Sequence, residues 1–132
     1  MKVFSLSRNE KVKKKNDFKK VYSSKKILFS SDLLVKSHYT IDLDEQFVGA
    51  KIAVAVSTKA GQAVWRNRIK RLIRESYRLN KQGLLKKAIE KKICLLIIFS
   101  PNKLSEFKNK KIYYKDIYKS VIELISKIEQ QI

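Results

Sequence analysis

The chain has 132 residues and a formal net charge of +19 at pH 7, from 31 Lys and Arg against 12 Asp and Glu, with a pI near 10.1. This length suits one domain with its own core, so we expect a single domain over 1–132 that begins with a basic, flexible segment over 1–15. Charge of this size opposes compaction unless a polyanion binds, which makes nucleic acid the expected partner.

The sequence argues against a membrane protein, a secreted protein and a protein that depends on a disulfide or a reactive thiol. The strongly apolar run Ile93 to Phe99 is too short to span a bilayer, and no apolar stretch of a signal peptide precedes the lysine cluster. We therefore expect a cytoplasmic protein with no membrane partner. Cys94 has no second cysteine to pair with and is predicted to be a buried hydrophobic residue. His38 is also alone, which favours a surface or strand-end imidazole over a ligand or a general base.

The first predicted element is a short helix around the string NDFKKVY, with Asn16 as its N-cap. Phe18 and Tyr22 are four residues apart, so both rings lie on one face of that helix. Two interpretations stay open at this point. Either both rings are core, or at least one is partly exposed among Lys19 and Lys20, where it offers bases a stacking platform.

Two strands follow. The stretch 27–39 contains a strand centred on residues 33–35, and 47–56 alternates apolar residues as a strand with one buried face does. Between them, Asp42, Asp44 and Glu45 are predicted to form a solvated loop. The simplest connection is a hairpin between the two strands.

The segment 59–78, KAGQAVWRNRIKRLIRESYR, predicts a glycine turn followed by an amphipathic helix. At 3.6 residues per turn, one stripe is mostly apolar and the opposite side is basic. The first stripe contains Trp65, Ile69, Leu72, Ile73 and Ser76 with Leu79 beside them, and the second contains Asn67, Arg71, Arg74 and Arg78.

Gly83 is expected to close that helix in a left-handed conformation, and 84–92 to add a helical turn or two. An apolar strand over 93–99 ends at Ser100 and Pro101, and 113–131 is a last amphipathic helix. The order helix, strand, strand, helix, strand, helix predicts an α+β fold in which helices cover one mixed sheet. General statistics favour a right-handed connection between the second and third strands.

Three functions compete for the basic helix. A solvated face usually mixes acids with bases, but Glu75 is the only acid in this helix. A reader of the DNA major groove needs a preceding helix and a tight turn, whereas a strand precedes Gly61. Binding of structured RNA needs a dense basic face with a planar amide, which Arg66, Asn67 and Arg68 provide.

The string AVWRNRIKRLIRE, preceded by VSTKAG, closely resembles the RNR signature of the bacterial ribonuclease P protein subunit. The length and the order of elements are similar over nearly the whole chain. The resemblance implies an α-β sandwich similar to domain 2 of ribosomal protein S5. It also implies a left-handed crossover at the RNR helix, in place of the right-handed one.

The family's protein subunit assists a catalytic RNA, and the resemblance implies the same here: no protein catalytic residues, and magnesium used by the RNA rather than bound strongly by the protein. The implied partners are ribonuclease P RNA and precursor tRNA, with no obligate protein partner. The 5′ leader is expected in a cleft between the RNR helix and the sheet. The residues that match the RNA-binding positions are Phe18, Tyr22, Lys36, Lys59, Arg66, Asn67, Arg68, Lys70, Arg71 and Arg74. Of these, the resemblance places six in the leader cleft: Phe18, Tyr22, Arg66, Asn67, Lys70 and Arg74.

Three positions depart from the family pattern. Thr58 precedes Lys59 where two consecutive basic residues are usual, Lys36 occupies a position that is often aromatic, and Ala53 replaces a frequent glycine. Two alternative functions remain. One is a structural RNA-binding protein such as a ribosomal component or assembly factor, and the other is a protein-only nuclease that uses the acidic cluster at 42–45.

Overall fold

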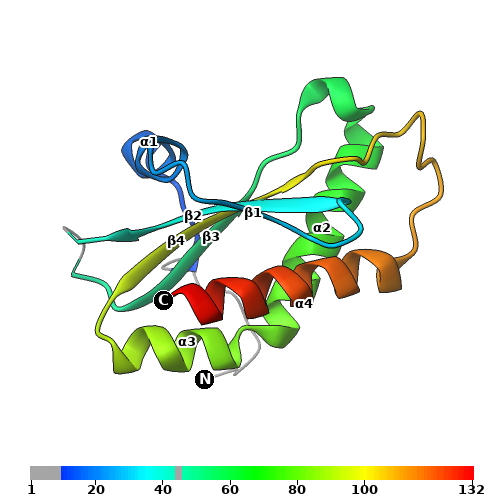
Figure 1. Ribbon diagram of the computed structural model, residues 1–132. Helices are drawn as coiled ribbons and strands as arrows, with labels where there is room; N and C mark the ends of the chain where they lie inside the picture. The colour runs from blue at the N-terminus through cyan, green and yellow to red at the C-terminus, as the bar shows by residue number, and fades with distance from the viewer. Residues whose placement is uncertain (1–9, 44–45) are drawn as a thin grey trace.

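The computed structural model describes residues 10–43 and 46–132, and shows a four-stranded mixed sheet with helices on both faces (Figure 1). The strand order is β1-β2-β4-β3, which confirms the α+β class. In chain order the elements are α1 (Lys15–Ser23), β1 (Ile27–Phe29), β2 (Val35–Asp42), β3 (Gly49–Val54), the 3-10 turn η2 (Thr58–Ala60), α2 (Ala63–Asn80), α3 (Gln82–Glu90), β4 (Cys94–Pro101) and α4 (Tyr114–Gln131). In these described parts no helix is long and apolar enough to cross a bilayer.

The apolar run becomes the central strand β4, because a strand covered on both faces needs apolar residues at every position. Leu95, Ile97 and Phe99 face the larger core under α2, α3 and α4. Cys94 is buried with Leu96 in a smaller core against α1, which confirms the prediction for this cysteine.

The predicted hairpin between the two early strands is wrong. β4 lies between them and pairs antiparallel with β2 and parallel with β3. The hairpin partner of β2 is β1, a three-residue strand that we did not predict, and Leu33 is in the turn between them with a φ of 61°. Since β3 and β4 are parallel, α2 lies in the crossover that joins them; the hand of this crossover stays a prediction.

The stripe of α2 is confirmed at Trp65, Ile69, Ile73 and Ser76, which are buried. Leu79 is instead exposed, and the buried ring that the wheel missed is Tyr77. The predicted end of the helix at Gly83 is wrong. α2 ends at Asn80 with a cap in the ordinary right-handed conformation, and Gly83 lies inside α3.

The buried face of α4 is as predicted, with Ile117, Val121, Leu124, Ile125 and Ile128 in the larger core. The expected connection over 84–92 is confirmed as α3, which is just over two turns long.

Asn16 is not the N-cap of α1. The helix begins at Lys15, two residues earlier than an Asn16 cap implies, after an extended Lys14 that makes no side-chain capping bond, and Asp17 is the acidic residue in the first turn. The segment before α1 is held against the sheet edge, where the Val12 N–H donates to the Ile52 carbonyl at 2.8 Å. Lys11 and Val12 of the segment predicted over 1–15 thus pair with β3, the flexibility of this segment stays a prediction, and residues 1–9 lie outside the described chain.

Candidate nucleic-acid interface

Two hollows lie side by side on the sheet face that carries α1, next to Ala53 of β3 and Ala55 just after this strand. Their volumes are about 640 and 330 Å³. Each is bounded by one ring of α1 and one cation of α2: Tyr22 with Lys70 in the larger, and Phe18 with Arg74 in the smaller. We call the two together the sheet groove. Both pairs step by four residues, so the walls run along one face of each helix.

The groove exists because small residues line its floor. Ala53 and Ala55 alternate with the core-facing Ile52 and Val54, so their short side chains point to the opposite face. On β4, Ser100 continues the row that begins with the buried Cys94, beyond the part covered by the smaller core. Alanine at position 53, where the family often has glycine, therefore still leaves the floor low.

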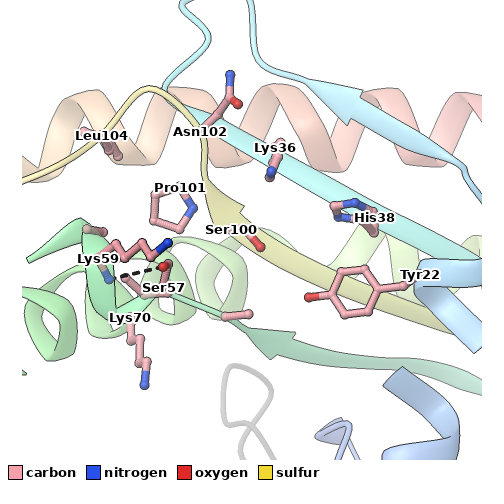
Figure 2. Close-up of a pocket in the computed structure, with 13 residues that line it drawn as sticks. Tyr22, Lys36, His38, Ser57, Lys59, Lys70, Ser100, Pro101, Asn102 and Leu104 are labelled. Carbon is pink, nitrogen blue, oxygen red and sulfur yellow. Dashed lines mark hydrogen bonds between the residues drawn. The ribbon is translucent and has the colours of Figure 1, made fainter. Parts of the chain in front are cut away.

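The aromatic wall is formed by α1. Tyr22 is 44% exposed, while Phe18 is half-buried against the smaller core, so the interpretation with an exposed ring is confirmed. The Tyr22 ring meets His38 edge to face, with centroids 4.9 Å apart. Figure 2 shows the Tyr22 hydroxyl pointing toward Ser100. His38 is in the middle of β2 rather than at a strand end, and its partly exposed ring lines the larger hollow.

Both polar rings of this wall are neutral near pH 7. Burial raises the pKa of Tyr22, and a hydrogen bond with Ser100 only partly offsets this. Burial also lowers the pKa of His38, and the charge of Lys36 lowers it further. Around Tyr22 the groove can therefore hydrogen-bond and stack with little charge apart from Lys36, whereas Lys11 and Lys13, just before α1, add cations to the lining of the smaller hollow.

The opposite wall is cationic. Arg74 is exposed and Lys70 half-exposed, and neither takes part in an ion pair within the described residues. Lys59 follows at the end of this wall in η2, where its backbone N–H donates to the Ser57 hydroxyl at 3.2 Å (Figure 2). Thr58, beside it, supplies no charge. The larger hollow thus has a neutral aromatic side and a cationic side, and the smaller hollow has cations both on α2 and in the segment before α1.

The outer surface of α2 carries a third hollow of about 610 Å³. Asn67, Arg68, Arg71 and Arg74 line it together with Lys70, as the helical wheel predicted for most of them. Lys70 and Arg74 border both this hollow and the sheet groove. One helix can therefore contact two different anionic partners on adjacent sides.

The predicted site residues fall into three groups. Phe18, Tyr22, Lys36, Lys59, Lys70 and Arg74 line the groove, and Asn67, Arg68 and Arg71 lie on the outer surface of α2. Arg66 lines neither, because its Nε donates to the Gly61 carbonyl at 3.0 Å. The guanidinium of Arg68 is partly engaged within the protein, because its Nη2 donates to the Ile112 carbonyl at 2.8 Å. The resemblance missed Ser100, Asn102 and His38, and the period-two polar spacing of Lys36, His38 and Thr40 in β2 is the signal that could have indicated His38.

The acidic cluster does not form a solvated loop as a whole. Asp42 is buried at the end of β2, where its Oδ1 is 3.0 Å from Lys20 Nζ, and residues 44 and 45 lie outside the described chain. Among the described residues, no group of three or more His, Cys, Asp or Glu side chains could hold a metal ion.

Comparison with known proteins gives the family from the sequence and a matching fold from solved structures. The family model described as Ribonuclease P matches residues 6–129. The ribonuclease P protein component of Clostridioides difficile strain 630 is 30% identical over 94% of this chain and 96% of its own length, and that of Clostridium botulinum strain 657 is 34% identical over 91% and 95%.

Solved structures support the fold. A mutant ribonuclease P protein from Staphylococcus aureus aligns with a TM-score of 0.71 at 21% identity, over 92% of this chain and 90% of that one. The Thermotoga maritima protein aligns with a TM-score of 0.70 at 19% identity, over 89% and 96%. Since the family match spans most of the sequence, the chain belongs to the family of ribonuclease P protein components, the protein subunits of a tRNA-processing endoribonuclease.

Proposed function

We propose that the sheet groove binds the single-stranded 5′ leader of precursor tRNA, while the outer surface of α2 docks on ribonuclease P RNA. The observation that carries the proposal is the repeated pairing of an α1 ring with an α2 cation, Phe18 with Arg74 and Tyr22 with Lys70. Unpaired bases present faces for stacking and phosphates present charge, on opposite sides of the strand. Each half of the groove therefore offers a ring on which a base can stack and a cation that can bind a phosphate.

The chemistry of the two sides supports this orientation of the strand. Bases lie against the neutral rings of Tyr22 and His38, whose faces can stack on any base. Phosphates lie along Lys70 and Arg74, and the guanidinium can bind two phosphate oxygens at once. Duplex RNA hides its base faces in the stack, so it makes no use of the aromatic wall.

Bond cleavage belongs to the RNA partner in this proposal. Magnesium bound by that RNA supplies the activated water, and the protein contributes position and positive charge. The protein's cations reduce the repulsion between leader and catalytic RNA, so less magnesium is needed to assemble the complex. A location in the cytoplasm, where precursor tRNA is processed in bacteria, fits this function.

The test combines the purified chain with a bacterial ribonuclease P RNA at low magnesium. We expect restored cleavage of a precursor with a long leader, and a weaker stimulation of a precursor with a one-nucleotide leader. Equal stimulation of both precursors would place the leader outside the groove. Absence of stimulation with several such RNAs would contradict the assembly itself, while raised magnesium, which rescues the RNA alone, checks that each RNA is active.

A further inference from the structure

We propose that the loop over 102–113 is a second single-stranded RNA site, in which Phe107 stacks on a base of the leader after it leaves the sheet groove. We call this loop the basic arm. The inference rests on the proposed leader groove and extends it. In Figure 1 the arm runs from the end of β4, beside α2, to the start of α4.

The arm displays an aromatic ring among cations. Phe107 is 96% exposed. A Phe side chain contributes about 1.5–3 kcal/mol when it is fully buried, and Phe107 does not contribute this to the fold. Around it the arm carries four lysines against one glutamate. Single exposed apolar residues are common, so the ring alone indicates little. A ring set among lysines is instead the composition that binds unpaired bases with their phosphates.

The arm is held in place rather than loosely attached. Leu104 and Ile112 are buried on either side of the exposed ring. The Trp65 indole N–H donates to the Asn109 carbonyl at 3.0 Å, and the Glu106 N–H donates to the Ala60 carbonyl at 2.7 Å. A ring on an anchored loop loses little conformational entropy when a base stacks on it.

The acid of the arm is used internally. Glu106 Oε1 accepts the Gln62 N–H at 2.8 Å, at the entrance of α2. Gly61 makes this closeness possible, because an added Cβ would lie 2.8 Å from both the Glu106 Cβ and the Trp65 ring. The arm therefore turns its carboxylate toward the helix, which leaves Lys108 and Lys110 as exposed cations.

The arm is continuous with the groove. A hollow of about 720 Å³ is lined on the arm by Phe107, Lys110 and the internally bonded Glu106, and on η2 by Lys59 and Ala60. Lys59 and Ala60 also line the larger hollow of the sheet groove. A strand that passes Tyr22 and Lys70 therefore meets Lys59 next and then Phe107. Longer leaders can use both sites, whereas short ones reach only the groove.

The experiment measures the affinity of the complex with ribonuclease P RNA for precursors whose leaders increase from one nucleotide to about fifteen, well beyond the span of the groove. For the wild type we expect affinity to rise first with occupation of the groove and again at longer leaders. Phe107→Ala removes the second rise, weakening long leaders about 5- to 100-fold, while Phe107→Tyr keeps it. Leu43→Ala, at another highly exposed apolar residue beyond the opposite end of the sheet, is the matched control and leaves both rises intact.

The outcomes separate this inference from the proposed function. If Phe107→Ala matches the wild type at every length while Tyr22→Ala weakens short leaders, the groove stands and the arm inference fails. An equal loss at all lengths, including precursors without a leader, would assign the arm to the catalytic RNA or to a protein and also overturn it. If affinity does not depend on leader length even in the wild type, the proposed function fails and the arm inference with it.

Discussion

Replacement of Arg74 by alanine isolates the cationic wall of the groove. The Arg74 side chain is exposed, borders the smaller hollow opposite Phe18, and has no ion-pair partner among the described residues. Its removal should therefore leave the fold intact. A lost charge-assisted contact costs about 1–3 kcal/mol, or about 5- to 150-fold in affinity.

The salt dependence of binding gives a second quantitative expectation for Arg74→Ala. Each phosphate contact to a single strand contributes about 0.7 to the slope of log affinity against log salt. A fourfold increase in salt therefore weakens the wild type by about 2.6-fold more than Arg74→Ala. The loss of affinity of Arg74→Ala relative to the wild type should therefore become about 2.6-fold smaller over this increase in salt.

The assay compares leader-bearing precursor with leaderless tRNA in the complex with ribonuclease P RNA, at two salt concentrations. Arg78→Ala is the matched control, because that guanidinium lies one turn further along α2, outside the groove, and forms an ion pair with Glu75. We expect the ratio of the two affinities to fall for Arg74→Ala and to stay near the wild-type value for Arg78→Ala. Equal losses for both RNAs with Arg74→Ala, or a deficit independent of salt, would refute the assignment of Arg74 to the leader wall.

Three further predictions concern the framework, and each is checked by denaturant or pH titration of the free chain. Gly61→Ala places a Cβ 2.8 Å from the Trp65 ring and should destabilise the fold by about 1–3 kcal/mol, whereas an unchanged midpoint would show that the arm can shift freely. Lys92→Gly should stabilise by about 1 kcal/mol, since Lys92 has a φ of 55° after α3; a loss of stability would contradict this. The Ser31 hydroxyl, Lys127 and the Ser31 N–H lower the pKa of Glu123 from 4.5 to about 2, so this carboxylate adds stability above pH 4.5 that is lost as pH falls toward 2. Glu123→Gln should flatten the stability curve in that window, and parallel curves would exclude this contribution.

Local elements could be predicted from the sequence because their signals are local. The period of α2 identified Trp65, Ile69 and Ile73 as buried, and the uninterrupted apolar run identified β4. The run indicated a buried strand, but it did not specify which strands lie on either side of it. Pairing of β2 with β4 joins residues far apart in the chain, and neither loop length nor periodicity specifies such a partner.

The site could be predicted only in part, for the same reason. The cations of α2 follow from helical spacing, but the groove depends on Ala53 and Ala55 lying beside β4, which needs the strand order. Arg66 was placed in the cleft through the resemblance, and its contact with the Gly61 carbonyl depends on the backbone of the turn. The basic arm has no regular period at all, so its anchored geometry was accessible only from the structure.

The sharpest test of leader binding is a crosslink map. A precursor tRNA carrying a photoreactive uridine in its leader is irradiated in the complex with ribonuclease P RNA, and the attached peptide is identified by mass spectrometry. Binding in the sheet groove predicts attachment to α1 around Tyr22, to residues 53–55, or to α2 around Lys70 and Arg74. Attachment to α3 or α4, on the opposite face of the sheet, would contradict it.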